Sequence, residues 1–297
     1  GERDQRVLLA LALAVRALRA GSTCLELSGI GQERIGAEEE VVGVPRQLWP
    51  EPVAWREAVA ASPLVTVGPA GGGDRPLRLV GDLLYLERYW AQESVVAGQL
   101  LARRRWEPAG IDPSRLRSAQ RELLGGADPD QAVAALVPLL APVTVVAGGP
   151  GTGKTHTLAR LLAVLWRALP NPPLVALAAP TGKAAVRMQE ALSEAVAELP
   201  DDLAAPLGGL EAGTIHRLLG WVPDSRSRFA HHAANPLPHD VVVVDEASMV
   251  NVTLMARLLE ALRPHARLVL VGDPDQLAPV EAGAVLADIV AAPAPAS

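Results

Sequence analysis

One glycine-rich segment restricts what this sequence can fold into more than any other. Residues 148–155 read GGPGTGKT and match the pattern G-x-x-x-x-G-K-[ST] at every fixed position. The apolar run Val143–Ala147 before it predicts a buried strand, and the spacing of residues 154–169 after it predicts a helix. A loop of this kind between a strand and a helix is typical of a parallel β-sheet covered by helices on both faces.

The residue types in this segment point to a triphosphate ligand. Glycines let the loop wrap closely, so that backbone N–H groups face phosphate oxygens, and the helix N-terminus adds partial positive charge. Lys154 is a compact cation that can reach the β- and γ-phosphates, and Thr155 is placed to ligate Mg²⁺. A plain glycine-rich turn with an exposed lysine is the alternative, and the flanking strand and helix disfavour it. The predicted nucleotide-binding residues are Gly148, Gly149, Pro150, Gly151, Thr152, Gly153, Lys154 and Thr155.

The composition draws attention to the same loop. Only two of the 27 basic residues are lysines, Lys154 and Lys183, and each directly follows a glycine. The 33 acidic residues give a formal net charge of −6, which argues against a protein that coats nucleic acid by bulk charge. A hydrophobic fraction of 49% excludes intrinsic disorder. The single cysteine, Cys24, excludes an internal disulfide and favours a reducing compartment, so we expect a cytoplasmic protein.

No uncharged apolar run reaches the roughly 18–20 residues that a membrane-spanning helix needs, so no membrane partner is expected. Residues 7–15 resemble the core of a signal peptide, but Arg16 and Arg19 follow at once and no small-residue cleavage site comes next. A largely buried helix is the preferred interpretation. Because the chain begins with Gly1 rather than Met, we expect that the native N-terminus is missing.

The chain is expected to divide into two parts with different patterns. In the first part, a helix is predicted over residues 5–20, and two strands over 64–67 and 77–80 are joined by a Gly/Pro-rich turn. Residues 83–105 have helical spacing with one apolar face, and prolines at 108–113 then interrupt the pattern. The predicted parts are a smaller, mainly helical N-terminal domain at 1–108, a linker at 109–125 and an α/β domain at 126–297.

The second part alternates short apolar runs with helical segments. The runs are rich in β-branched residues and apolar on both faces, which is typical of strands in a covered parallel sheet. We therefore predict an α/β fold in which a parallel sheet carries helices on both faces. The predicted strands are 143–147, 175–178, 241–244 and 268–271, and the helices are 154–169, 183–199 and 252–262.

Two carboxylates directly follow one of these strands. The four valines Val241–Val244 deliver Asp245 and Glu246 to the carboxyl end of a strand, where ligands bind in doubly wound folds. Asp245 is expected to hold Mg²⁺ and Glu246 to act as the general base toward the attacking water. A polar strand end without chemistry is the alternative for such a pair alone. Its position about 90 residues after the glycine-rich loop favours the catalytic interpretation.

Three more loops carry polar side chains at predicted strand ends. Gln276 follows the strand at 268–271 and is able to hydrogen-bond a γ-phosphate or its water, unless its amide only caps the loop. Residues 179–185 read APTGKAA, in which a hydroxyl, a helix N-terminus and a lysine suit the backbone phosphate of a polymer. Residues 213–217 read GTIHR and offer a similar loop. Helix capping is the alternative for both of these loops.

Two further patterns do not fit the sites that they imitate. Residues 27–32, LSGIGQ, resemble the signature of transporter-type ATPases, but that signature belongs after the glycine-rich loop and these residues lie far before it. Three histidines, His231, His232 and His239, have no cysteine nearby and a spacing that suits no common metal site. We expect exposed histidines here rather than a metal centre.

The motifs in their order resemble those of superfamily 1 helicases and, more narrowly, of the RecD family, the alpha subunits of exodeoxyribonuclease V (RecBCD) complexes. The similar blocks are GGPGTGKT, APTGKAA, GTIHRLLG, NPLPHDVVVVDEASM and LVLVGDPDQLAPVEAGAVL, with weaker similarity at 20–25 and 84–90. The resemblance implies a P-loop NTPase (RecA-like) domain that uses ATP and Mg²⁺ and moves 5′→3′ on single-stranded DNA. It also implies a hetero-oligomer with RecB-like and RecC-like subunits that acts in double-strand break repair and recombination, with the N-terminal domain docked on the RecC-like subunit.

The resemblance also assigns individual residues. Gln131 matches a glutamine that reads adenine, and Lys154, Glu246 and Gln276 match catalytic positions. Residues 221–238 match a hairpin that acts as a strand-separating pin, in which Arg226 and Arg228 either contact phosphates or are only solvated. The residues that match DNA-holding motifs are Pro180, Thr181, Lys183, Thr214 and His216.

The second RecA-like domain of the family, with its arginine finger, has no counterpart in these 297 residues. Since the finger supplies much of the transition-state stabilisation, we expect this fragment to bind ATP weakly and not to unwind DNA alone. Two alternatives to a motor subunit stay open: a non-catalytic nucleotide-binding scaffold, and a P-loop ATPase that acts on protein. The complete catalytic set disfavours the scaffold, and the TGK and TIH loops disfavour the protein-directed ATPase.

Overall fold

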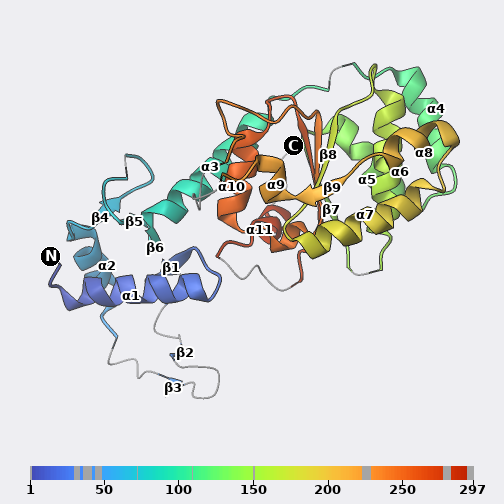
Figure 1. Ribbon diagram of the computed structural model, residues 1–297. Coiled ribbons are helices and arrows are strands. Elements are labelled where there is room, and N and C mark those ends of the chain that lie inside the picture. Colours follow the sequence, from blue (N-terminus) through green and yellow to red (C-terminus); the bar gives the residue numbers. More distant parts are fainter. Residues whose placement is uncertain are drawn as a thin grey trace. The chain divides into compact units, whose positions relative to one another are not determined.

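The computed structural model describes residues 2–29, 49–71, 73–108, 110–149, 151–222, 229–276 and 282–292, and the backbone of the short strands β2 (Arg34–Ile35) and β3 (Val42–Gly43). The chain forms two compact units, coloured along the sequence in Figure 1. The first unit comprises Gly1–Ser94, Asn251–Thr253 and Pro279–Gly283, and the second comprises Val95–Val250, Leu254–Ala278 and Ala284–Ser297. Among the described residues, no helix combines the length and the apolar character needed to cross a membrane.

The first unit packs helices against a four-stranded sheet. Its helices are α1 (Gln5–Arg19), α2 (Pro52–Ala61) and the first half of α3 (Glu87–Arg103), so most of its regular structure is helical. Its core contains Trp55, which is fully buried, together with leucines from the sheet. The strands are β1 (Cys24–Glu26), β4 (Val65–Val67), β5 (Leu77–Val80) and β6 (Leu83–Leu86), in the order β1-β6-β5-β4.

Two details of this unit differ from the sequence prediction. Residues 83–86 form strand β6 and not the first turn of a helix, so the helix prediction was wrong for these four residues. The apolar run LLYL pairs with β5 on one side and β1 on the other, and this pairing outweighs the helical spacing. The predicted strands β4 and β5 are present but pair in parallel, with Val65 opposite Leu77, because the connection between them runs back along the unit.

A buried ion pair organises the connection between β4 and β5. Arg78 is 1% exposed and donates hydrogen bonds to both carboxylate oxygens of Glu87 at 2.8 Å. Its guanidinium also donates to the carbonyl oxygens of Gly68, Ala70 and Gly71. A single side chain therefore satisfies the backbone of a loop that lacks regular structure.

The second unit is built on five parallel strands. They are β7 (Val143–Ala147), β8 (Val175–Ala179), β9 (Ala212–Thr214), β10 (Val241–Val244) and β11 (Arg267–Gly272), in the order β7-β11-β10-β8-β9. Every neighbouring pair is parallel. Val241–Val244 is buried along its whole length, as expected for the central strand of a sheet covered on both faces. The predicted α/β fold is confirmed, and β9 is an additional edge strand that was not predicted.

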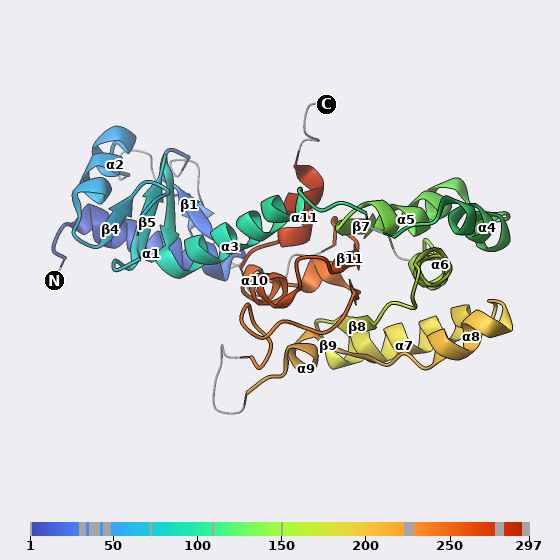
Figure 2. The same ribbon diagram turned by 90° about the horizontal axis from the view of Figure 1, so that it is seen from above.

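Helices cover both faces of this sheet, as Figures 1 and 2 show. Those on one face are α4 (Pro113–Leu124), α5 (Pro129–Leu140), α6 (Lys154–Ala168), α7 (Gly182–Val196) and α8 (Asp201–Gly208). The other described helical segments are α9 (Ile215–Leu219), η3 (Ala247–Met249), α10 (Val252–Ala261) and α11 (Val285–Ala291), and α10 lies on the opposite face. The core is formed by the apolar side of α6 against the strands.

The linker predicted at 109–125 contains the helix α4. Leu124 belongs to the core of the second unit, and Ile111, Leu116 and Leu123 pack against that core. The change from one compact unit to the other falls at Ser94, inside α3. Helix α4 therefore packs as part of the second unit. The domain boundaries at 108 and 125 stay a prediction.

Candidate nucleotide-binding site

The parallel strands of the second unit all end at the same edge of the sheet, and a cleft of about 780 Å³ opens there. Loops that follow β7, β8, β10 and β11 contribute to it, together with one side of α7. The residues that line it are Gly151, Thr152, Gly153, Lys154, Thr155, His156, Thr181, Lys183, Ala184, Arg187, Met188, Ala191, Glu194, Asp245, Glu246, Met249 and Gln276. The cleft therefore gathers Lys154, Thr155, Asp245, Glu246 and Gln276, all of which the sequence analysis singled out.

The backbone of the glycine-rich loop explains its glycines. Gly151 and Gly153 have φ angles of 75° and 78°, in the left-handed region that favours glycine. Gly153 is the N-cap of α6, and a Cβ atom there would lie 2.9 Å from Nε2 of Gln131. A Cβ atom on Gly148 would lie 2.7 Å from Oγ1 of Thr152. Pro150, the remaining predicted loop residue beside Gly149, lies outside the described residues.

The side chain of Lys154 is held by its own loop. Its Nζ donates hydrogen bonds to the carbonyl oxygens of Gly148 at 2.7 Å and Gly149 at 2.8 Å. Oγ1 of Thr152 donates to the same Gly149 oxygen at 2.9 Å. The loop is also tied to the neighbouring strand, because the N–H of Gly148 donates to the carbonyl of Gly272 at 3.1 Å. These bonds give the lysine a defined position at the mouth of the loop.

The two consecutive acids sit at the end of β10. Asp245 donates its N–H to Ala178 of β8, which anchors it at the sheet edge. Glu246 has a φ of 49° and is the one described non-glycine residue with a positive φ. Its N–H donates to Oδ1 of Asp245 at 2.9 Å. A non-glycine residue in the left-handed region is strained, and the surrounding structure has to hold it there. Residues of this kind are common at functional sites.

The surroundings of Asp245 raise its pKa. Burial raises the pKa of Asp245 above its ordinary value, and the negative charge of Glu246 raises it further. The N–H of Glu246 and the positive charge of Lys154 act in the opposite direction and lower that pKa, with less effect than burial. A nearby cation would stabilise the charged form of this partly buried carboxylate.

Gln276 lies in the loop after β11 and lines the cleft. This loop is capped by Asp273, whose Oδ1 accepts the N–H of Asp275 at 3.1 Å and whose carbonyl accepts the N–H of Gln276 at 3.2 Å. No hydrogen bond joins the Gln276 amide to another described residue. Among the described residues, the side chain that caps this loop is therefore Asp273 and not Gln276.

Gln131 and Arg160 form a hydrogen bond beside the loop. The sequence predicted a role for Gln131 but not for Arg160. Gln131 stands in the first turn of α5, after the N-cap Asp128. Its Nε2 lies 3.5 Å from the carbonyl oxygen of Thr152, and its Oε1 accepts a hydrogen bond from Nη1 of Arg160 at 3.1 Å. Arg160 belongs to the second turn of α6 and gave no signal in the sequence, because its partner is 29 residues away.

The loops predicted to hold DNA lie at the ends of β8 and β9. Ala179 is opposite Thr214 in the parallel pairing, so the segment that starts at Pro180 and the one that contains His216 begin side by side. The hydroxyls of Thr181 and Thr214 both cap helices, since each accepts the N–H of the third residue that follows it. Helix capping is thus a structural role of both threonines.

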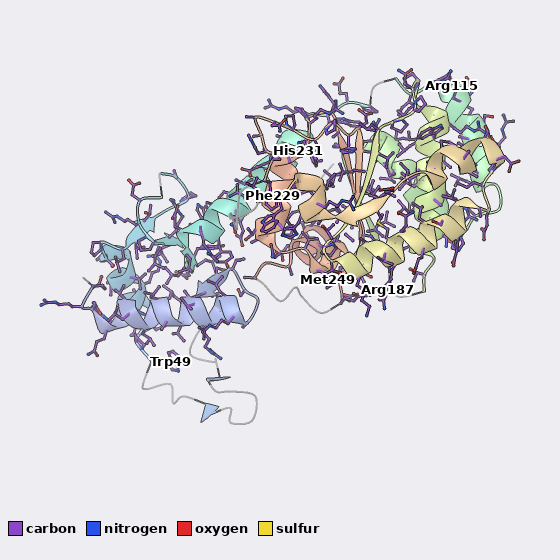
Figure 3. All side chains as sticks on the ribbon, viewed as in Figure 1. Trp49, Arg115, Arg187, Phe229, His231 and Met249 are labelled. Atoms are coloured by element: carbon purple, nitrogen blue, oxygen red, sulfur yellow. The ribbon has the colours of Figure 1, made fainter. Side chains whose placement is uncertain are left out.

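Two residues of this group, Thr181 and Lys183, also line the cleft of the glycine-rich loop. Lys183 lines the same cleft as Lys154, together with Arg187 and Glu194 of α7, two residues that the sequence analysis missed. Figure 3 labels Arg187 on α7 and Met249 close to it, and both line this cleft. The spacing of four residues between Lys183 and Arg187 was the available signal, since it puts both on one face of a helix. A separate groove of about 330 Å³ lies between Gly182, Val186 and Thr214.

The predicted hairpin is described only at its base. Trp221 pairs with Phe229 in an antiparallel bridge, and the Phe229 ring lies 5.8 Å from that of His216. Residues 223–228, with Arg226 and Arg228, lie outside the described part of the chain, as do residues 30–32 of the LSGIGQ segment. His231 and His232 are joined to Asn235 and its neighbours by hydrogen bonds of the hairpin base.

Family models match two parts of the chain. One, described as an AAA domain, matches residues 131–282, which is more than half of the sequence. The other, described as the N-terminal domain of the RecBCD enzyme subunit RecD, matches residues 1–85. The chain belongs to the AAA domain family and is a relative of RecD.

Individual relatives among curated proteins carry names that include RecD. The RecBCD enzyme subunit RecD of Mycolicibacterium smegmatis is 53% identical over 97% of this chain and 50% of the relative. That of Mycobacterium tuberculosis is 51% identical over 98% of the chain and 48% of the relative. An ATP-dependent RecD2 DNA helicase of Deinococcus radiodurans is 43% identical over 48% of the chain and 17% of the relative. The chain thus spans about half the length of these two mycobacterial RecD relatives.

Proposed function

We propose that this chain is part of an ATP-dependent 5′→3′ DNA helicase subunit of a RecBCD-type complex that acts in double-strand break repair and recombination. The observation that carries the proposal is the cleft that gathers Lys154, Thr155, Asp245, Glu246 and Gln276 at one edge of the sheet. The names of the relatives, RecBCD enzyme subunit RecD and ATP-dependent RecD2 DNA helicase, support it. A cytoplasmic location and the domains 1–108, 109–125 and 126–297 belong to the same proposal.

The residues of the cleft fit ATP and Mg²⁺. The phosphates would be bound by the N–H groups of the loop, by Lys154 and by the N-terminus of α6. Gly151 and Gly153, whose φ angles are positive, let a phosphate approach the backbone closely. The hydroxyl of Thr155 and the carboxylate of Asp245 are hard oxygen donors that would hold Mg²⁺. The raised pKa of Asp245 fits this role, because a nearby cation would favour its charged form. Bound Mg²⁺ supplies positive charge at the phosphate oxygens.

Hydrolysis then depends on what the side chains of the cleft do. Glu246 accepts the proton of the attacking water as the water oxygen bonds to the γ-phosphorus, and its left-handed backbone directs the carboxylate. Lys154 balances charge on the phosphate oxygens as the bond to the leaving diphosphate breaks. Gln276, whose amide has no described partner, orients the water or the γ-phosphate by hydrogen bonding.

Single-stranded DNA is proposed to contact the loops at the ends of β8 and β9. Parallel pairing brings Pro180 and the helix that carries His216 to the same edge of the sheet. Lys183 makes no ion pair with another described residue, so its charge is available to a phosphate of the DNA backbone or of the nucleotide. Thr181 and Thr214 shape these loops as helix caps. RecB-like and RecC-like subunits are the proposed protein partners, the latter through the first unit.

The rate of ATP hydrolysis with and without single-stranded DNA tests this function. The full-length protein and its Lys154→Ala variant would be compared at saturating ATP, with a DNA oligomer as the only added effector. The helicase proposal requires a rate that DNA stimulates and that Lys154→Ala abolishes. A rate that ignores DNA would favour an ATPase acting on protein, and no hydrolysis under any condition would favour the scaffold subunit.

A further inference from the structure

We propose that a second pocket, at the edge of the sheet opposite the nucleotide cleft, receives an acidic side chain of a partner protein. The pocket has a volume of about 310 Å³ and lies where β8, β10 and β11 begin. The group that would bind the carboxylate is the guanidinium of Arg267, the first residue of β11. The inference does not depend on the proposed ATPase, because this pocket and the nucleotide cleft share no described lining residue.

The charge of Arg267 is buried and lacks a carboxylate partner. The residue is 7% exposed, and its Nε donates a hydrogen bond to the carbonyl oxygen of Pro138 at 2.9 Å. Among the residues that the structure describes, no group accepts a hydrogen bond from the two Nη atoms, and the guanidinium forms no ion pair. Burial lowers the pKa of Arg267, and the negative charge of Asp240 raises it by a smaller amount. The cost of removing this cation from water is therefore not offset within the described part of the chain.

Asp240 lines the same pocket, but other donors already bind its carboxylate. Its Oδ2 accepts the N–H of Leu174 at 2.8 Å, and its Oδ1 accepts a hydrogen bond from Nη2 of Arg263 at 3.2 Å. The two Nη atoms of Arg267 are not enclosed by protein atoms, so they reach the open space of the pocket that the residue lines. Four of the five N–H donors of Arg267 are thus available to an incoming group.

The walls of the pocket restrict how a ligand can approach these donors. The Trp106 ring covers one face of the guanidinium, with 4.9 Å between the ring centroid and Cζ of Arg267. The ring is held in place because its Nε1 donates to the carbonyl oxygen of His265 at 3.4 Å. Leu169 and Pro173, which are both buried, add apolar surface. A ligand therefore has to meet the planar edge of the guanidinium, which binds a carboxylate or a phosphate through two parallel hydrogen bonds.

The other lining residues favour a carboxylate of a protein over a phosphate. Asp240 and Glu107 carry negative charge at the pocket, which repels a phosphate or a DNA backbone more strongly than a single carboxylate. Pro172 and Pro173 have no N–H group, so their backbone can only accept hydrogen bonds. A peptide supplies both complementary groups, a side-chain carboxylate for Arg267 and backbone N–H groups for these carbonyls. The occupant is thus an aspartate or glutamate side chain with its flanking backbone.

Binding of short peptides to the full-length protein, purified without partner proteins, tests the inference. The probes are acetyl-Ala-Glu-Ala-amide, the matched acetyl-Ala-Gln-Ala-amide and inorganic phosphate. The protein carries fluorotryptophan, and the fluorine resonance of Trp106 is identified by its loss in Trp106→Phe. We expect the glutamate peptide to shift this resonance in a saturable manner and the glutamine peptide to bind about tenfold more weakly or worse.

Two variants examine the charges of the pocket separately. Arg267→Met should weaken binding of the glutamate peptide by about tenfold or more, because the charged donor is lost. Glu107→Gln changes an exposed side chain and should strengthen that binding by about twofold, because a repulsive charge is removed. Arg117→Met, at an exposed position of α4, is the matched control and should leave the affinity unchanged. If Arg267→Met fails to fold, the result with Glu107→Gln decides.

Several results would overturn the inference. Equal binding of the glutamate and glutamine peptides would show that the carboxylate is not recognised. Stronger binding of phosphate than of the glutamate peptide would identify a phosphate site instead. A glutamate affinity that neither Arg267→Met nor Glu107→Gln changes would place the peptide elsewhere. The absence of a shift with every probe would also overturn it, and each of these results would leave the proposed ATPase intact.

Discussion

The Nζ atom of Lys154 lies 2.7 Å from the carbonyl oxygen of Gly148, six residues earlier in the chain. A second bond joins it to Gly149, so two of the three donors of the ammonium group hold the loop and one is left for a phosphate. These two contacts give a physical reason for a lysine at this position, in a chain whose other basic residues are 25 arginines and Lys183. A guanidinium is planar and larger than an ammonium group, so we expect that it does not fit the same loop.

The first prediction concerns this geometry. Lys154→Arg keeps the positive charge but not the compact shape, so we expect it to lower ATP affinity by about tenfold or more. Titration of a fluorescent ATP analogue measures the affinity, and thermal unfolding checks that the fold is retained. ATP affinity equal to that of the unchanged protein would show that the charge alone matters.

The second prediction separates binding from chemistry. Glu246→Gln preserves the shape of the side chain and removes its ability to accept a proton, so ATP hydrolysis should fall by about a hundredfold or more. ATP affinity should stay within about twofold, because the loop contacts of Lys154 do not involve Glu246. Single-turnover hydrolysis and equilibrium binding on the same preparation provide both values. A variant that hydrolyses ATP at a near-normal rate would remove Glu246 from the mechanism.

The third prediction concerns the first unit. Arg78→Met leaves the Glu87 carboxylate and three loop carbonyls without their donor, which should destabilise the unit by about 3–5 kcal/mol. Amide hydrogen exchange of residues 65–90 in the full-length protein should accelerate by more than about a hundredfold. Arg78→Met combined with Glu87→Leu should recover part of the protection. Unchanged exchange in the single variant would mean that the pair contributes little.

The fourth prediction concerns His239, which is partly buried beside the sheet and not exposed as the sequence predicted. Burial lowers the pKa of His239 below its ordinary value of 6.5, the charges of Arg263 and His231 lower it further, and Asp240 raises it. Its Nδ1 is buried and has no partner among the described groups. Because its pKa is lower in the folded protein than in the unfolded chain, neutral His239 contributes to the stability of the fold. This contribution is fully present above about pH 6.5 and is lost as the pH falls through the pKa of the folded state.

His239→Gln should therefore reduce the loss of thermal stability that occurs between about pH 7.5 and about pH 5.5. His265→Gln, at an exposed position of the same unit, is the matched control and should behave like the unchanged protein. The comparison needs only melting temperatures at a series of pH values. An identical acid sensitivity in the unchanged protein and His239→Gln would contradict the prediction.

Local patterns predicted the parts of this molecule that depend on local chemistry. The loop at 148–155 was recognisable because its glycines, its lysine and its flanking strand and helix lie in one stretch of sequence. The valines before Asp245 predicted a fully buried strand, and Val241–Val244 is buried throughout. These features need no knowledge of distant residues.

Features that depend on distant partners were not predicted. The run Leu83–Leu86 reads as a helix until its two neighbouring strands are known. Strand β9 has only three residues, and its pairing with β8 is what defines it. The contact of Gln131 with Arg160 exists because α5 packs on α6, which no spacing between the two residues reveals. Arg187 differs from these cases, because its spacing of four residues from Lys183 on one helix is a local signal.

Separation of DNA strands by the full-length protein tests the central claim most directly. Partial duplexes with a 5′ or a 3′ single-stranded tail would be incubated with ATP and either the unchanged protein or Lys154→Ala. We expect ATP-dependent unwinding of the 5′-tailed duplex, and we expect Lys154→Ala to abolish it. Unwinding that persists in Lys154→Ala, or no preference for the 5′ tail, would contradict it.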